Sequence, residues 1–152
     1  MMRYTIHKTP LAPLLLAAGP EGLCAVSFEV KIGTFWTRDD AAFDDLKFQL
    51  ERFFQGRPAD FDGPLDYGTA TPFQRSVWQQ LRKIPFGETR TYGQVAAAIG
   101  NPKAGRAVGA ACGANPLAIV VPCHRVVAAG GELGGFSAGL EFKKFLLKLE
   151  SA

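Results

Sequence analysis

The sequence predicts a mixed α/β (α+β) protein: a small N-terminal antiparallel sheet with a covering helix, then a mainly helical part with a helix-turn-helix and a loop of candidate reactive residues. Three observations predict this. Short β-type runs broken by turn residues fill the first third, helix start and stop signals follow, and the charge changes sign near Thr71. We therefore expect two domains, residues 1–68 and residues 69–152.

Two strands and one helix are expected in the first domain. Residues 14–17 and 23–30 are rich in strand-forming residues, and a Gly-Pro turn separates them. Residues 39–55 begin with acidic residues, end before Gly56, and carry apolar residues at helical spacing, namely Phe43, Leu46, Leu50 and Phe53. This helix should cover the sheet. Residues 56–71 have no clean period and predict a connection.

Capping signals divide the second domain into helices. Thr71 followed by Pro72 predicts a helix that runs to Pro85, with a buried face of Phe73, Val77, Leu81 and Ile84. Thr91 and Gln94 form a capping box for a short helix that Gly100 ends. We expect Asn101 and Pro102 to cap a further helix over residues 103–112, which gives a candidate helix-turn-helix.

The last of these helices has very little side-chain bulk. Its small residues are Ala104, Gly105, Ala107, Gly109, Ala110 and Ala111. Close packing against another helix explains this composition as well as entry into a DNA groove does. In a groove, Arg106 would be the long projecting side chain.

Composition and charge narrow the class of protein. With 47% hydrophobic residues the chain can bury a core, and no apolar run approaches the roughly 20 residues of a membrane helix. No secretory signal is recognisable, so a cytoplasmic protein is expected. Residues 1–71 carry seven Lys/Arg against ten Asp/Glu, whereas residues 72–152 carry ten against four. The basic second half is compatible with a phosphate-binding surface, although many other domains are equally basic.

The three cysteines, Cys24, Cys112 and Cys123, include no C-x-x-C pair. This argues against a disulfide framework and fits a reducing compartment. His7 and Cys24 are too scattered to predict a metal site, and we expect none.

A reactive cysteine is suggested by the residues after an expected strand over residues 117–121. Pro122 ends the strand and Cys123, His124 and Arg125 follow. A thiol needs a base or a positive field to reach its thiolate form, and His124 could be that base. Neighbours in extended backbone point to opposite sides, so we expect a bridging water rather than direct contact. Taken alone, the dipeptide is more often an unreactive buried cysteine beside a surface histidine.

Several ordered motifs remove that ambiguity. They are TPFQRSVWQQL, IPFGETRTYGQVAAAIGNPKAGRAVGAACGANP, VPCHRVV and GGFSAGLEFKKFLLKLE. Residues 72–150 closely resemble the C-terminal domain of the O6-alkylguanine-DNA alkyltransferases (methylated-DNA–protein-cysteine methyltransferases). The stretch LLLAAGPEGLCAVSFE resembles their first domain, so the resemblance extends over nearly the full length.

The resemblance implies a set of catalytic roles. Cys123 would accept the alkyl group, His124 would act as base through water, and Glu150 would orient the imidazole. Asn115 would brace the active-site turn. Tyr92 would help to turn out the nucleotide and offer a proton to the leaving guanine.

It also implies residues that bind DNA and the damaged base. Arg106 would fill the space left by the extruded nucleotide, on a helix whose start at Ala104 and Gly105 approaches the DNA. The Ser137 amide and the carbonyls of Cys123 and Val126 would read the base edge. Phe136 stands where many relatives have tyrosine, which removes a hydroxyl but keeps a hydrophobic wall. Cys112 places a second thiol nearby, with no histidine after it.

The implied function is direct-reversal DNA repair, in which one alkyl group moves irreversibly from O6-alkylguanine in duplex DNA to Cys123. A thioether cannot be resolved, so the protein is consumed without turnover or cofactor. We expect a monomer, with O4-alkylthymine as a further candidate substrate.

Three alternatives remain: a binding module that flags damage without chemistry, a helix-turn-helix regulator, and a cysteine hydrolase. The sequence does not define the range of alkyl groups, cooperativity on DNA, or regulation.

Overall fold

The structure is a computed structural model that describes residues 1–151. Its internal contacts group into two compact units. The first comprises Met1–Gly68 together with Pro116–Ala118, and the second comprises the remaining residues from Thr69 onward. The division into two domains, residues 1–68 and residues 69–152, stays a prediction. No helix among the described residues has both the length and the apolar character needed to cross a bilayer.

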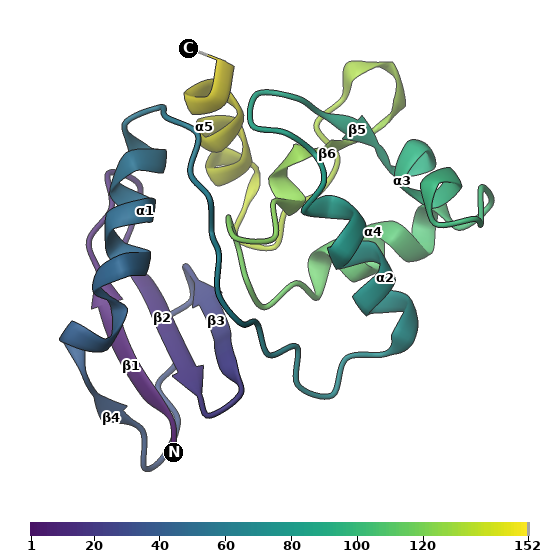
Figure 1. The fold of residues 1–152 in the computed structure, drawn as a ribbon. Helices are drawn as coiled ribbons and strands as arrows, with labels where there is room; N and C mark the ends of the chain where they lie inside the picture. The colour runs from purple at the N-terminus through teal and green to yellow at the C-terminus, as the bar shows by residue number, and fades with distance from the viewer. Residues whose placement is uncertain (152) are drawn as a thin grey trace. The chain divides into compact units, whose positions relative to one another are not determined.

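The first unit contains a four-stranded sheet in the order β3-β2-β1-β4 (Figure 1). Its strands are β1 (Arg3–His7), β2 (Leu14–Gly19), β3 (Gly22–Ser27) and β4 (Thr37–Arg38). Both expected strands are present, and the predicted fold class is confirmed. The sequence did not predict β1, and β4 pairs parallel to it, so the sheet is not purely antiparallel. β3 ends at Ser27, short of the expected residue 30.

A helical segment covers this sheet, as expected (Figure 1). It begins as a 3-10 turn, Asp40–Phe43, in which the Asp39 side chain accepts a hydrogen bond from the Ala42 amide. It continues as α1 (Asp44–Phe54), and the residues buried along the segment are Phe43, Leu50 and Phe53. The predicted apolar spacing is therefore confirmed, except that Leu46 is only half-buried.

The outer edge of β3 is paired with two distant segments of the chain. Leu23 bridges Leu65 of the irregular connection. Val26 bridges Leu117, because the Val26 amide donates to Pro116 O and the Ala118 amide donates to Val26 O, both at 2.9 Å. Residues 116–118 therefore belong to the first unit although their neighbours in sequence do not.

Capping boxes start two helices of the second unit, one at Thr71, where the sequence predicted a simple N-cap, and one at Thr91, where it predicted a capping box. The Thr71 hydroxyl accepts from the Gln74 amide at 3.1 Å at the start of α2 (Pro72–Leu81), and Thr91 and Gln94 do the same for α3 (Tyr92–Ala98). The predicted cap at Asn101 and Pro102 is wrong. Residues 101–104 form a turn closed by the Ala104 amide on Asn101 O, so α4 (Gly105–Gly113) begins after Ala104, without a side-chain cap.

The expected strand over residues 117–121 is also wrong. Ile119 has a φ of 72°, which breaks the extended run after Leu117 and Ala118. Cys123 consequently does not follow a strand but begins a short 3-10 helix, Cys123–Arg125. The next residues, β6 (Val126–Val127), pair parallel with β5 (Arg90–Thr91). This pairing brings the start of α3 close to the Cys123 segment.

The last helix of the second unit is α5 (Leu140–Ser151). Its buried residues are Lys143, Leu146 and Glu150, which share one face at helical spacing. One face of α5 thus carries an ammonium and a carboxylate into the interior. Both groups lie close to the Cys123–Arg125 segment.

Candidate active site

Cys123 lies at the floor of a cavity of about 310 Å³ in the second unit. Only 6% of the residue is exposed. The wall contains four residues that the sequence analysis singled out, together with three glycines, and consists of Tyr92, Gly109, Cys112, Gly113, Gly135, Phe136 and Ser137. The structure therefore gathers side chains from α3, α4 and the loop before α5 around one thiol.

His124 and Glu150 lie behind this thiol, closed to solvent. The His124 Nε2 atom is 2.5 Å from Glu150 Oε2, and both side chains are at most 2% exposed. Glu150 also accepts from the Gly87 amide at 3.0 Å. A histidine that donates from Nε2 to a carboxylate keeps its lone pair on Nδ1, where it can accept a proton.

Arg125 is the third member of this buried cluster, and the sequence did not predict a role for it. Its Nε atom donates to both carboxylate oxygens of Glu150, at 2.9 and 3.0 Å. Its Nη1 atom donates to Ile84 O at 2.8 Å, and the guanidinium lies over the Phe86 ring. Four separate contacts thus fix the cation beside the carboxylate.

The pKa of Glu150 and the pKa of His124 are both lowered in this cluster, but for different reasons. Burial would raise the pKa of Glu150, but hydrogen bonds from His124 and Arg125 outweigh it and lower the pKa to about 2. Burial lowers the pKa of His124, and the positive charge of Arg125 acts in the same direction against the pull of Glu150. At neutral pH the cluster therefore contains a carboxylate, a guanidinium and an uncharged imidazole.

The Cys123 thiol is protonated in this resting state. Burial raises its pKa, although a hydrogen bond from the Asn115 side chain and the charge of Lys143 oppose the rise. Asn115 also donates from Nδ2 to Val121 O at 2.8 Å, which ties it to the turn before Cys123. A thiolate can form here only if a base takes the proton during the reaction.

Cys112 is a much weaker candidate nucleophile than its neighbour. It lies at the end of α4 and lines the same cavity. Burial, together with the proximity of Cys123, raises the pKa of its thiol to about 12. With so high a pKa, Cys112 remains a protonated thiol at neutral pH.

Lys143 is a buried residue of this site that sequence reasoning missed. Its Nζ donates to Val126 O at 2.6 Å and to Gly135 O at 3.0 Å, and lies 5.8 Å from the centre of the Tyr92 ring. Burial lowers the pKa of this ammonium, while the two nearby thiols oppose that shift. The signal was available in the sequence, because Lys143 shares a helical face with Leu146 and Glu150.

The two carbonyl groups expected to read a base, those of Cys123 and Val126, each accept one hydrogen bond already. Val126 O accepts from Lys143, and Cys123 O accepts from the Val126 amide. A carbonyl oxygen has two lone pairs, so each retains one for a ligand. Burial raises the pKa of Tyr92, and neighbouring Cys112 adds to the rise, so its phenol is protonated at neutral pH.

The expected DNA-binding residues of α4 do not line the cavity. Arg106 is exposed, and so are three small residues of the same helix, Ala107, Ala110 and Gly113. Ala104 and Gly105 are half-buried at its start. The opposite face is buried, and Trp78 donates from Nε1 to Ala111 O at 2.8 Å. Close packing on one face and a bare surface on the other thus coexist in one helix.

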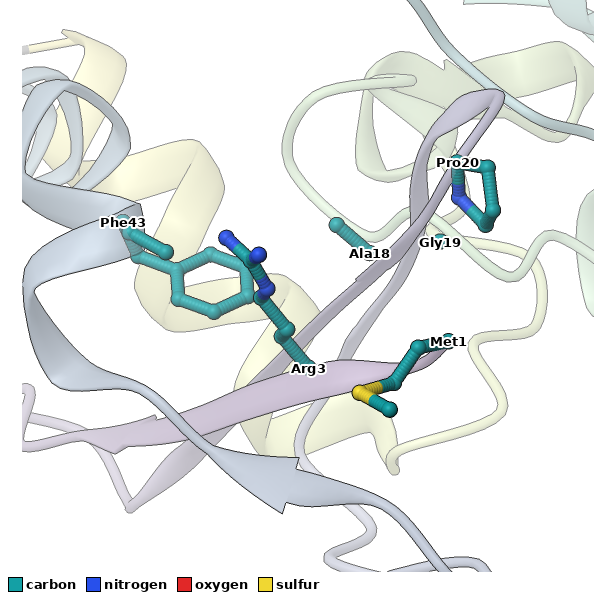
Figure 2. A pocket seen from close by; sticks show the side chains of 7 residues that line it. Met1, Arg3, Ala18, Gly19, Pro20 and Phe43 are labelled. Atoms are coloured by element: carbon teal, nitrogen blue, oxygen red, sulfur yellow. The ribbon is translucent and has the colours of Figure 1, made fainter.

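A second cavity, of about 460 Å³, lies in the first unit (Figure 2). Met1, Arg3, Phe43 and the turn from Ala18 to Pro20 line it. Arg3 faces Asp39 at 3.5 Å in a solvent-exposed ion pair. The lining contains no nucleophile and no base, so we assign no chemistry to it.

Fold and site together define a class of protein with a candidate cysteine nucleophile. In this class a buried cysteine, histidine and glutamate lie beneath a cavity, and a pair of short helices lies next to it, one of which carries an exposed arginine. Residues 2–67 match the ribonuclease-like domain of 6-O-methylguanine DNA methyltransferase, and residues 72–152 match its DNA-binding domain. The chain belongs to the 6-O-methylguanine DNA methyltransferase family.

Individual relatives cover almost the whole chain. A methylated-DNA–protein-cysteine methyltransferase of Methanosarcina acetivorans is 47% identical, over 99% of each chain. The crystal structure of Mycobacterium tuberculosis O6-methylguanine methyltransferase is 44% identical with a TM-score of 0.90, and covers 99% of this chain and 93% of that one. A structure of OGT from the same organism in complex with DNA is 43% identical with a TM-score of 0.90, over 97% and 92% of the two chains.

Proposed function

We propose that this protein repairs DNA by moving an alkyl group from O6-alkylguanine in a duplex to the sulfur of Cys123. Family membership makes the reaction class that of methylated-DNA–protein-cysteine methyltransferases. The observation that carries the assignment of Cys123 is its position at the cavity floor, directly before the buried His124–Glu150 pair. O4-alkylthymine is a further candidate substrate, and we expect a cytoplasmic monomer.

The proposed reaction begins with a proton transfer. His124 Nδ1 takes the Cys123 proton through one water molecule, and Glu150 stabilises the imidazolium that forms. The thiolate attacks the alkyl carbon, so an S–C bond forms as the C–O6 bond breaks. The leaving guanine gains negative charge at O6, and the protonated Tyr92 phenol supplies the compensating proton.

The proposed base-binding groups lie around the cavity. Ser137 N–H and the second lone pairs of Cys123 O and Val126 O would read the edge of a flipped guanine, with Phe136 as the apolar wall. Arg106 would fill the gap in the DNA stack. The flat guanidinium suits this role because it can stack on neighbouring bases.

The product explains why each molecule acts once. A thioether on Cys123 has no leaving group that a nearby residue could displace. The protein is therefore consumed in proportion to the lesions it repairs, which is the stoichiometry that the family implies. No cofactor enters the balance of atoms.

Mass spectrometry after incubation with a duplex containing O6-methylguanine tests this proposal. We expect one added methyl group per protein molecule, on a peptide containing Cys123. Cys123→Ser should abolish transfer while DNA binding persists, and Cys112→Ser should still accept the methyl group. With a labelled methyl group on the guanine, release of labelled methanol into solution would instead indicate a hydrolase. Methylation of Cys112 in the Cys123→Ser variant would show that Cys123 was wrongly assigned as the acceptor.

A further inference from the structure

We propose that Arg125 is a positioning residue that keeps His124 uncharged before the reaction, by balancing the negative charge of Glu150 inside a cluster closed to solvent. This inference rests on the proposed function, because it concerns the base that receives the Cys123 proton. Arg125 does not line the cavity, so it acts only through Glu150 and His124.

The geometry shows how Arg125 is held beside Glu150. Its Nε donates to both carboxylate oxygens, its Nη1 donates to Ile84 O, and its Cζ lies 5.8 Å from the Phe86 ring centre. The side chain is 11% exposed, against 2% for Glu150. The cation therefore cannot move away from the carboxylate without breaking several buried contacts.

The charge balance follows from these contacts. Arg125 carries +1 and Glu150 carries −1, so the cluster is neutral when His124 is neutral. Without the charge of Arg125, the same cluster would hold an isolated buried carboxylate, which is strongly unfavourable. Uptake of a proton by the His124–Glu150 pair removes that charge. The other charged group acting on His124 is Lys143 of α5, which every variant below retains.

A proton already on the pair changes the chemistry. His124 could not accept the Cys123 proton until the extra proton had left for the solvent. In the wild type the proton passes from sulfur to imidazole with no net exchange with water, so the transfer rate should be independent of pH around neutrality. A variant without the Arg125 charge should need a deprotonation first, and its rate should rise with pH.

Two measurements test this on the full-length protein. In single-turnover transfer from saturating O6-methylguanine duplex, Arg125→Gln should lose about tenfold in rate for each pH unit below its shifted midpoint. Arg125→Lys keeps the charge and should retain a level profile at a lower plateau. Lys148→Gln removes an exposed charge from α5, the same helix as Glu150, and should match the wild type.

Imidazole ¹⁵N NMR reads the same state without any substrate. The chain has two histidines, so His7→Gln leaves His124 as the single imidazole signal. We expect a neutral ring at pH 7 in the wild type and a protonated ring in Arg125→Gln. If that variant does not fold, the comparison moves to Glu150→Gln, in which adding Arg125→Gln must still raise the titration midpoint of His124.

An unchanged His124 midpoint and an unchanged pH profile in Arg125→Gln would overturn the inference, whatever the size of the rate loss. A uniform loss at every pH would mean that Arg125 only supports the structure. The proposed function fails separately, if the wild type itself transfers no methyl group.

Discussion

Gly134 lies where any side chain would meet the proposed proton donor. It has a φ of +72°, and a Cβ built there would be 2.5 Å from the Tyr92 hydroxyl oxygen. We expect Gly134→Ala to displace Tyr92 and to slow methyl transfer by roughly ten- to hundredfold, since small misplacements of catalytic groups are costly. Single-turnover transfer from an O6-methylguanine duplex measures this.

Gly130 provides a matched control for the backbone strain. Its φ is +78°, but an added Cβ would have nothing within 4 Å. Gly130→Ala should therefore lower the unfolding free energy only by the strain of the positive φ, about 1 kcal/mol. Its rate of methyl transfer should be unchanged. Equal transfer rates in the two variants would show that contact with Tyr92 does not matter.

Individual residues differ in how well the sequence predicted them. Cys123, His124 and Glu150 came from a motif resemblance, and the structure brings them together. Arg125 and Lys143 were missed, because a charged side chain is expected to face solvent and only tertiary structure shows it buried among carbonyls and a carboxylate. In Lys143 the apolar helical face was a usable signal, whereas nothing local marks Arg125.

At the scale of elements, α4 leads to a prediction about Arg106. Extruding a nucleotide costs a few kcal/mol, and a side chain that fills the gap opposes its return. Arg106→Ala should therefore slow transfer from duplex DNA by roughly ten- to hundredfold. Transfer from free O6-methylguanine base should hardly change, because no extrusion is needed. Arg106→Lys should restore only part of the rate, since an ammonium cannot stack.

Lys103 separates stacking from simple charge attraction. It is exposed just before α4 and carries the same charge. Lys103→Ala should weaken DNA binding, and its defect should vanish at saturating DNA in low salt. The same behaviour in Arg106→Ala would reduce Arg106 to one more phosphate contact.

Elements held by local interactions were predicted best. The capping boxes of α2 and α3 are hydrogen bonds between residues three apart, so the sequence displays both partners. β1, β5 and β6 depend on pairing with remote segments and were not predicted. The expected strand over residues 117–121 failed for a related reason: an apolar run indicates burial but not its backbone conformation, and Ile119 adopts a positive φ.

For the whole molecule, the buried cluster predicts how stability depends on pH. The folded state holds His124 at a lowered pKa, so below about pH 6.5 the unfolded chain binds more protons than the folded one. The unfolding free energy should therefore fall as the pH drops below that value. A second decline should begin near pH 4.5, where the Glu150 carboxyl of the unfolded chain takes up a proton. In the folded state the pKa of this carboxyl is about 2, so it stays ionised there.

Urea unfolding between pH 8 and pH 3 measures both declines. His7 also has a pKa lowered by burial, so His7→Gln is the appropriate background. The decline below about pH 6.5 should still be present in the His7→Gln variant. Unfolding free energies that stay level down to pH 5 would show that His124 is not held neutral.

The pairing of residues 116–118 with β3 bears on any attempt to divide the protein. A fragment that starts at Thr69 would keep these three residues but lose Val26, which supplies one hydrogen bond to Pro116 and accepts one from Ala118. Leu117, fully buried in the intact chain, would become solvent-exposed six residues before Cys123. Such a fragment should aggregate, and a working split version should be obtained only by supplying residues 1–68 as a second polypeptide.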